Sequence, residues 1–167
     1  SADGLVFTPT STAEFFPSDM LIACLIDYNG YLYAGTNNQT LGGQLYRTSN
    51  GVYWENLTDS IPNHTPVHQE IHDIDTTGGF IWLTVYTDTL LSTSGMPVWR
   101  STDASITSFV QSNLDGFGNP LIDGENPAVY GFHGNVYFGG PNYTNGAQIW
   151  RTQTPTVGID EMNNFKC

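Results

Sequence analysis

The sequence has few positive charges: four Lys and Arg residues stand against 16 Asp and Glu, a formal net charge of −12 over 167 residues. Phosphate backbones and anionic membrane surfaces are bound by clustered Lys and Arg, so we expect neither nucleic acid nor an acidic membrane as a partner. No apolar run approaches the roughly 20 residues of a membrane span, and we expect none. Charged residues are 12% of the chain, and this scarcity, with few strong helix formers, excludes a helical bundle.

Cysteine is nearly absent, since the chain has only Cys24 and Cys167. Two alternatives are open: one disulfide between them, or a buried thiol at Cys24 and an unpaired thiol near the end of the chain. Four Asn-x-Ser/Thr sequons accompany the acidic, lysine-poor composition and favour an extracellular or cell-surface glycoprotein. The candidate glycosylated residues are Asn38, Asn56, Asn63 and Asn142.

Glycine and aromatic residues are plentiful, with 18 Gly and 13% Phe, Trp and Tyr. Together with abundant Asn, Thr and Ser, they are typical of many short strands joined by tight turns. The length suits a single domain with a sizeable core. The composition therefore predicts an all-β domain.

One pattern, G-x-x-[LVI]-[YW]-R-[ST], occurs three times, at residues 42–48, 95–101 and 146–152. Its arginines are 53 and 51 residues apart (100 − 47 and 151 − 100), and every arginine of the chain occupies this position. Four short strands are predicted around each copy, and four-stranded units with a period of about 50 residues are typical of β-propeller blades. The residues expected to be structural at the recurring positions of this repeat are Arg47, Arg100, Arg151, Trp99 and Trp150.

The predicted blades cover approximately residues 13–60, 68–112 and 126–152 of one repeat domain, 1–167. The alternative is a β-sandwich, which also has many short strands but does not require the same signature three times. A propeller closes with about four to eight blades, so this chain supplies too few. Either two copies form one ring, or the chain is a piece of a longer propeller, or companion chains complete it. We therefore expect a homo-oligomer or companion chains, because an open fan exposes its end sheets.

A second pattern, [ST]-x-[DN]-G-x-x-[WF], follows the first repeat arginine with Asn50 and Trp54, and also begins the chain with Asp3. A looser copy after the second arginine keeps Asp103. In such a turn Asp or Asn caps backbone N–H groups, Gly takes positive φ and the aromatic residue packs between layers. The pattern fails after the third arginine, so we expect residues 1–10 to supply the closing outer strand of the third blade.

The segment L-Y-R-T-S-N-G-V-Y-W, residues 45–54, resembles a degenerate Asp-box, or bacterial neuraminidase repeat. The segments Y-N-G-Y-L-Y-A-G-T-N and G-A-Q-I-W-R-T are similar to repeats of large secreted propeller proteins of bacteria and archaea. The resemblance covers the chain to about residue 152 and departs from the family pattern at Asn50, Ala104 and residues 153–156. It implies a propeller but no single activity, because Asp-box propellers include sialidases, other glycosidases, sorting receptors and non-catalytic modules.

The repeat arginines also suggest a carboxylate-binding triad of the kind that sialidases have. Equivalent positions of successive blades are spread around a ring, so we expect each arginine to pair locally and to serve the structure. No motif identifies a catalytic Tyr and Glu pair. We therefore expect a non-catalytic extracellular propeller unit for surface assembly or for glycan or protein binding. The alternative is a fragment of a sialidase-like or other propeller glycoside hydrolase.

Oxygen-rich segments near the predicted innermost strands are candidates for a Ca²⁺ site, formed by Asp73, Asp75, Asp115 and Asp123. A second candidate, for zinc, is the run of His64, His68 and His72 at four-residue spacing. Four-residue spacing places ligands on one face of a helix, whereas this segment reads as a loop leading into a strand. We therefore favour a polar loop here.

Overall fold

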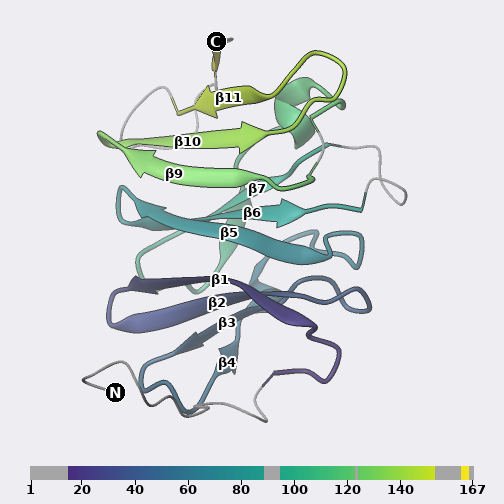
Figure 1. Cartoon of the computed structure of the whole chain (residues 1–167). Helices are drawn as coiled ribbons and strands as arrows, with labels where there is room; N and C mark the ends of the chain where they lie inside the picture. The colour runs from purple at the N-terminus through teal and green to yellow at the C-terminus, as the bar shows by residue number, and fades with distance from the viewer. Residues whose placement is uncertain (1–14, 89–94, 123, 153–162, 166–167) are drawn as a thin grey trace, which may run out of the picture.

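The computed structural model describes residues 15–88, 95–122 and 124–152, and the backbone alone of 163–165. The described chain folds into antiparallel sheets of four consecutive strands, which lie one above another and are called blades 1, 2 and 3 from here on (Figure 1). The prediction of an all-β fold is confirmed. Within these residues no helix has the length and apolar character to cross a membrane.

In each blade, every strand pairs with the next strand along the chain. Blade 1 contains β1 (Leu21–Tyr28), β2 (Tyr31–Asn37), β3 (Leu45–Thr48) and β4 (Glu55–Asn56), followed by the short 3-10 helix η1 (Thr58–Ser60). Blade 2 contains β5 (Glu70–Thr77), β6 (Phe80–Tyr86), β7 (Val98–Ser101) and β8 (Phe109–Gln111), followed by η2 (Asp115–Gly118). Blade 3 contains β9 (Ala128–Phe132), β10 (Asn135–Gly140), β11 (Gln148–Arg151) and β12 (Asn163–Phe165).

The turn between the first two strands has the same form in every blade. Both of its central residues have positive φ, which matches the twist of the strands that they join. These residues are Asn29 and Gly30 in blade 1, Gly78 and Gly79 in blade 2, and His133 and Gly134 in blade 3. This turn fixes the register between the two strands of each hairpin.

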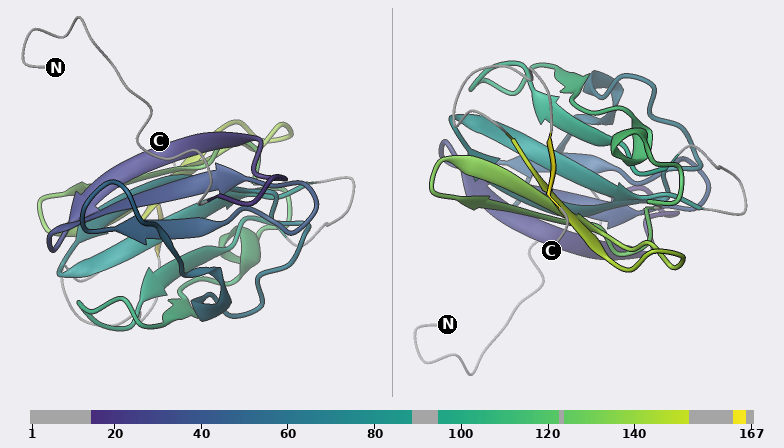
Figure 2. Two further views of the ribbon diagram at one scale, coloured as in Figure 1. Left: turned by 90° about the horizontal axis from the view of Figure 1, so that it is seen from below. Right: turned by 90° about the horizontal axis from the view of Figure 1, so that it is seen from above.

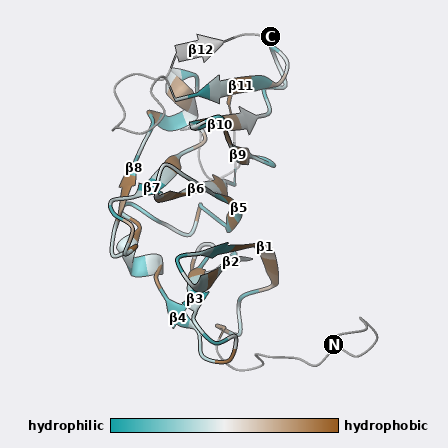
Figure 3. Cartoon of the chain, turned by 90° about the vertical axis from the view of Figure 1, so that its left-hand side faces the viewer, coloured by the Kyte–Doolittle hydropathy of each residue, from teal (hydrophilic) through white to brown (hydrophobic). Residues whose placement is uncertain are grey.

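The blades are arranged as a fan. Its first strands, β1, β5 and β9, lie along one side, and β4, β8 and β12 lie along the other (Figure 3). Seen along the stack, the sheets overlap face to face (Figure 2). Blades 1 and 2 are also joined by one strand pairing, between Asn37 at the end of β2 and Glu70 at the start of β5, so that their strands form one continuous sheet.

Two apolar clusters hold the fan together, one in each space between neighbouring sheets. Between blades 1 and 2, Tyr33 and Leu45 pack in one cluster with Ile71, Leu83 and Trp99. Between blades 2 and 3, the second cluster contains Trp82, Met96, Val98, Val129, Val136, Phe138 and Trp150. The hydrophobic burial that stabilises this fold therefore lies between blades rather than inside any one of them.

The fourth strand of blade 3 differs from the prediction. This position is occupied by β12, which pairs with β11 through Ile149 and Phe165, so blade 3 continues beyond residue 152. Residues 1–10, expected to supply this strand, and Asp3 among them, lie outside the described residues. The sequence did not reveal β12 because it is three residues long and the recognisable turn pattern is missing before it.

The first strand of blade 1 also differs. A continuous apolar run such as Met20 to Ile26 is typical of a strand buried on both faces, but Met20 is 66% exposed, Leu21 48% and Leu25 59%. The equivalent strand of blade 2 is covered, and its Ile71 is 0% exposed. The difference arises because blade 1 precedes β5, whereas no described sheet precedes β1.

Candidate functional site

Two of the three repeat arginines, Arg47 and Arg100, contact aromatic rings of their own blades. The guanidinium of Arg47 lies 4.9 Å from the ring centre of Tyr31, and Nε donates to Glu55 Oε2 at 2.7 Å. Arg100 lies 4.4 Å from the ring centre of Phe80. Arg151 holds the same register position on β11, opposite Tyr137, and it too has an interaction partner. Local pairing of this kind stabilises each blade and leaves a carboxylate-binding triad without support.

The turns after the repeat arginines are built around their Asn or Asp residue. Asn50 Oδ1 accepts hydrogen bonds from the N–H groups of Val52 and Tyr53, at 2.9 and 3.0 Å. Asp103 Oδ1 accepts one from Ser105 at 2.8 Å. The blade 2 turn also contacts blade 1, where Arg47 donates to the Ser105 carbonyl at 3.2 Å. The blade 2 turn therefore links neighbouring blades as well as neighbouring strands.

The repeat tryptophans lie in the core. Trp99 is 1% exposed and its indole N–H donates to the Pro62 carbonyl at 3.1 Å. Trp150 is 1% exposed and stacks on Phe117, with 4.6 Å between ring centres. Trp54 is half-buried and packs against Phe15 at 5.3 Å. All three side chains therefore serve packing between layers.

The candidate calcium ligands have separate protein partners. Asp73 Oδ2 accepts the Val129 N–H at 3.0 Å, which joins blade 2 to blade 3. Asp75 accepts from the Thr77 hydroxyl at 3.4 Å, and Asp115 accepts from Gln111. Asp123 lies outside the described residues. Among the residues that are described, no three His, Cys, Asp or Glu side chains are grouped as metal ligands.

The histidines fall into two different environments. His72 on β5 pairs with Glu70, which also accepts from Asn37 Nδ2 at 2.8 Å. The hydrogen bond with Glu70 raises the pKa of His72, and the same bond lowers the pKa of Glu70. His64 and His68 instead pack around Trp99, and burial lowers the pKa of each to about 4. His64 and His68 are therefore neutral at pH 7.

The sequons differ in accessibility. Asn38 is 0% exposed and Asn142 is 3% exposed. The Oδ1 atom of each caps a tight turn by accepting two backbone N–H groups, so both side chains are structural. Asn56 is exposed but its Nδ2 donates to Gln44, whereas Asn63 is exposed at positive φ. Burial of the first two amides argues against their glycosylation and leaves Asn63 as the open acceptor.

Of the two cysteines, the structure describes Cys24. Cys24 is a free thiol that donates to the Ile71 carbonyl at 3.4 Å. Burial raises its pKa to about 12, so it stays protonated and unreactive. Cys167 lies outside the described residues.

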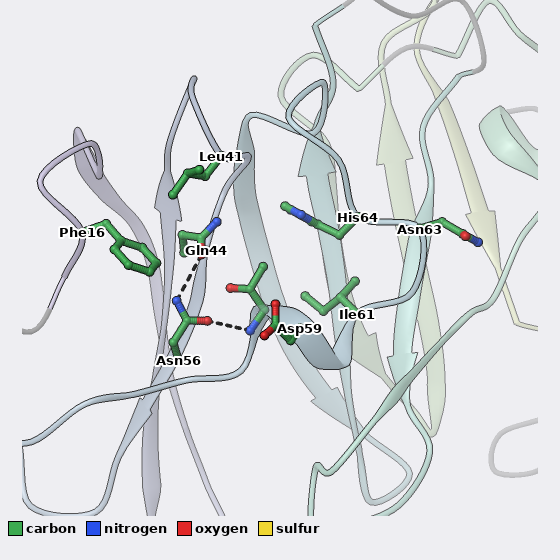
Figure 4. Close-up of a pocket in the computed structure, with 9 residues that line it drawn as sticks. Phe16, Leu41, Gln44, Asn56, Asp59, Ile61, Asn63 and His64 are labelled. Carbon is green, nitrogen blue, oxygen red and sulfur yellow. Dashed lines mark hydrogen bonds between the residues drawn. The ribbon is translucent and has the colours of Figure 1, made fainter.

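A pocket of about 580 Å³ opens on the outer half of blade 1 (Figure 4). Phe16 lies on one side of it, Ile61 and His64 lie on the other, and Gln44 and Asn56 lie between them (Figure 4). Leu41, Thr58, Asp59 and Asn63 complete the lining. This size is within the range of ligand sites, about 300–1,000 Å³.

The pocket floor is a fixed pair of amides. Asn56 Nδ2 donates to Gln44 Oε1 at 3.1 Å, and Asn56 Oδ1 accepts the Thr58 N–H at 2.8 Å. Gln44 Nε2 donates in turn to the Gly42 carbonyl at 2.6 Å. Each amide is thereby oriented before any ligand arrives.

Asp19 fixes the wall that carries Phe16. Its carboxylate accepts hydrogen bonds from the Phe16 N–H, the Tyr46 hydroxyl, the Thr36 hydroxyl and the Asn38 amide, at 2.7 to 3.0 Å. Phe16 also makes an edge contact with the ring of Tyr46. Sequence reasoning missed Phe16 and Gln44, although the glutamine recurs as Gln148 at the same repeat position and could have identified that part of the site.

The fold is similar to known propellers. No family model matches the sequence, and no curated protein sequence matches it significantly. A GH43 endo-arabinanase from Bacillus licheniformis, a five-bladed β-propeller, superposes with a TM-score of 0.54 at 15% identity over 93% of this chain. A candidate exo-β-1,3-galactanase from Bifidobacterium bifidum s17 gives 0.51 at 12% identity over 82% of this chain. The propeller prediction is confirmed.

The chain spans 58% of the endo-arabinanase and 50% of the galactanase structure. For a ring of five blades, 58% corresponds to about the three blades found here. The fold is thus an incomplete propeller.

Proposed function

We propose that this chain is a non-catalytic section of an extracellular β-propeller, completed into a ring by further blades, that binds carbohydrate. The observation that carries the proposal is a change in exposure at equivalent positions of the repeat. In the repeat signature, an apolar residue stands two positions before the arginine. In blades 1 and 2 this residue is Leu45 and Val98, and each is 0% exposed. Ile149, at the same position of blade 3, is 50% exposed.

The opposite end of the fan shows the matching change. Leu25, Ile74 and Val129 hold equivalent positions on the first strands, since they pair with Ala34, Leu83 and Phe138 respectively. Ile74 is 6% exposed and Val129 is 4% exposed, whereas Leu25 is 59% exposed. Among the described residues, blade 1 therefore has no sheet packed against its first strand, and blade 3 has no sheet packed against the face that carries Ile149.

We propose that a second copy of this chain supplies the two missing neighbouring sheets. The exposed side chains of blade 3, including Tyr130 at 66% and Phe132 at 54%, would meet the apolar first strand of another copy's blade 1. Each contact would repeat the packing already present between successive blades. Covering both faces also removes the exposed apolar surface that otherwise favours aggregation.

The carbohydrate part of the proposal has two supports. Two similar propellers are named as an endo-arabinanase and a candidate exo-β-1,3-galactanase, which supports a carbohydrate ligand for this propeller. The chain itself exposes an aromatic side chain suited to stacking on sugar rings outside the proposed contact between copies, Tyr143, which is 75% exposed. The acidic composition and the open sequon at Asn63 support an extracellular or cell-surface location.

An Asp-box origin of the repeats belongs to the same proposal. Its support is the turn geometry, in which Asn50 and Asp103 cap backbone N–H groups after the repeat arginine. The experiment that tests the function combines the particle mass in solution with binding to a glycan array. We expect an assembly heavier than the 18.3 kDa chain that retains glycans.

The second candidate function is part of a propeller glycoside hydrolase, as both similar structures are named for such activities. Carboxylates on β5, the first strand of blade 2, are the residues that this alternative would use. Asp73 accepts a hydrogen bond from the Val129 N–H, and Glu70 pairs with His72, which favours a structural role for both carboxylates. Turnover of fluorogenic arabinosides or galactosides by the assembled protein would favour the hydrolase over the binding unit.

A further inference from the structure

We propose that the pocket on the outer half of blade 1 is a binding site for one ring of an uncharged saccharide. The inference rests on the carbohydrate part of the proposed function and assigns it to a place in the fold. The pocket lining comes from segments on either side of β3, and β1, β5 and β9 contribute nothing to it among the described residues. The site is therefore separate from the inner strands on which propeller blades converge.

The walls of the pocket suit a sugar ring. Phe16 is 45% exposed, so part of its ring is available for stacking against the C–H face of a pyranose or furanose. Ile61 and His64 face it from the other side of the pocket (Figure 4). Leu41, 46% exposed, adds apolar surface at the edge. The two apolar walls suit the C–H faces of a sugar ring, and the polar floor suits its hydroxyl groups.

The floor supplies hydrogen-bonding groups that are already oriented. Asn56 Nδ2 donates to Gln44 Oε1, and Gln44 Nε2 donates to the Gly42 carbonyl with one of its two hydrogens, so the Gln44 amide has a second hydrogen to offer. The Nε2 atom of His64 is buried and has no hydrogen-bond partner. Asp59, exposed on η1, adds a carboxylate that accepts from hydroxyl groups. Donors and acceptors together suit a ligand with several hydroxyls.

The charge of the pocket selects against acidic sugars. Its lining contains Asp59 and no Lys or Arg. His64 does not supply a positive charge, because burial keeps its pKa at about 4. The whole chain carries a net charge of −12, which adds to the repulsion of an anion. A neutral hexose or pentose unit is therefore favoured over a uronate or a sialate.

Isothermal titration calorimetry of the assembled protein tests the site with three probes: arabino-oligosaccharide, β-1,3-galacto-oligosaccharide and oligogalacturonide. We expect at least one neutral probe to bind and the oligogalacturonide not to bind. Phe16→Ala and Asn56→Ala should each weaken binding of that neutral probe at least about tenfold. Tyr53→Ala is the matched control, because Tyr53 is an aromatic residue of the same blade that is 71% exposed and lies outside the pocket. It should bind as the wild type does.

Circular dichroism and thermal melting of each variant distinguish a loss of binding at the pocket from a loss of the folded structure. Neutral saccharide binding that survives both Phe16→Ala and Asn56→Ala would overturn this pocket while leaving a glycan-binding propeller in place. Stronger binding of oligogalacturonide than of either neutral probe would overturn the neutral ligand class. Failure of all three probes, together with an empty glycan array, would overturn both the pocket and the carbohydrate function.

Discussion

The carboxylate of Asp73, on β5, accepts a hydrogen bond from the backbone N–H of Val129, on β9, with 3.0 Å between Oδ2 and N. Asp73 also accepts the N–H of Ile74 through Oδ1. One side chain thus ties the first strand of blade 2 to the first strand of blade 3. The register between two blades depends on a polar contact as well as on the apolar cluster between them.

Replacing Asp73 by Ala should lower the free energy of unfolding by about 1–3 kcal/mol, because the Val129 N–H loses its acceptor in a partly buried place. Asp73→Asn keeps an acceptor oxygen and should cost less. Urea titrations of the wild type and both variants measure the difference. Equal losses of unfolding free energy in Asp73→Asn and Asp73→Ala would contradict a hydrogen-bonding role.

The pH dependence of the same variants gives a second, independent result. Desolvation raises the pKa of Asp73, against the lowering effect of its hydrogen bonds to Val129 and Ile74. A raised folded-state pKa contributes stability below the unfolded-state pKa, and that contribution is lost as the pH rises through the folded value. The stability of Asp73→Asn relative to wild type should therefore increase as the pH rises from about 3 to about 6. A constant or falling difference would be inconsistent with this burial.

The Glu70–His72 pair should stabilise the fold in a limited pH window. The raised pKa of His72 gives stability that is complete below its unfolded value of 6.5 and is lost as the pH rises through the folded value. The lowered pKa of Glu70 gives stability that is present above 4.5 and is lost in acid. A double-mutant cycle with Glu70→Gln and His72→Gln should show a coupling of about 0.5–1.5 kcal/mol near pH 5.5, vanishing near pH 9. Undiminished coupling at the higher pH would exclude the ion pair as its source.

The buried histidines should have the opposite effect. The pKa of His68 is lowered to about 4 by burial, so protonation favours the unfolded chain as the pH falls from 6.5 towards 4. His68→Phe keeps an aromatic ring beside Trp99, whose centre lies 5.2 Å from that of His68. The slope of unfolding free energy against pH over this interval should be shallower in the variant by up to about 2.303RT per pH unit, which corresponds to the uptake of about one proton on unfolding. Identical slopes would show that His68 does not titrate with unfolding.

Gly35 and Gly139 are equivalent residues in blades 1 and 3, since they pair with Leu45 and Ile149 of the repeat signature. A Cβ atom at Gly35 would lie 2.5 Å from the Ile71 carbonyl oxygen of blade 2. Gly35→Ala should therefore destabilise the fold by about 1–3 kcal/mol. Gly139→Ala should leave the stability of the single chain nearly unchanged in thermal melts, because its Cβ would meet only Ala128, at 3.7 Å, among the described residues. Equal melting temperatures for the two variants would contradict the close approach of blades 1 and 2.

Much of the architecture could be predicted from the sequence because each blade repeats a local signal. The hairpin turns at Asn29–Gly30 and His133–Gly134 and the signature strands β3, β7 and β11 all come from short-range patterns. The exposure of Leu25 could not be predicted, because an apolar run indicates a strand suited to burial and does not show whether a neighbouring sheet exists.

The candidate pocket could not be predicted for a different reason. Phe16, Gln44 and Ile61 belong to segments that are far apart in the chain and come together only after blade 1 has folded. No local period relates them. Likewise, the acidic residues expected as calcium ligands share a position near the predicted innermost strands, but this does not bring their side chains together: Asp73 accepts from the Val129 N–H and Asp115 from Gln111.

Completion of the ring by a second copy is tested most directly by the mass in solution of the wild type and of Gly139→Ala, measured by light scattering after size exclusion. Packing of another blade on blade 3, as blade 2 packs on blade 1, would bring a backbone carbonyl against residue 139. We predict that the wild type forms an assembly heavier than 18.3 kDa and that Gly139→Ala remains folded but stays at the mass of one chain. A folded wild type that is monomeric at all concentrations, or a variant that assembles equally well, would contradict ring completion by this interface.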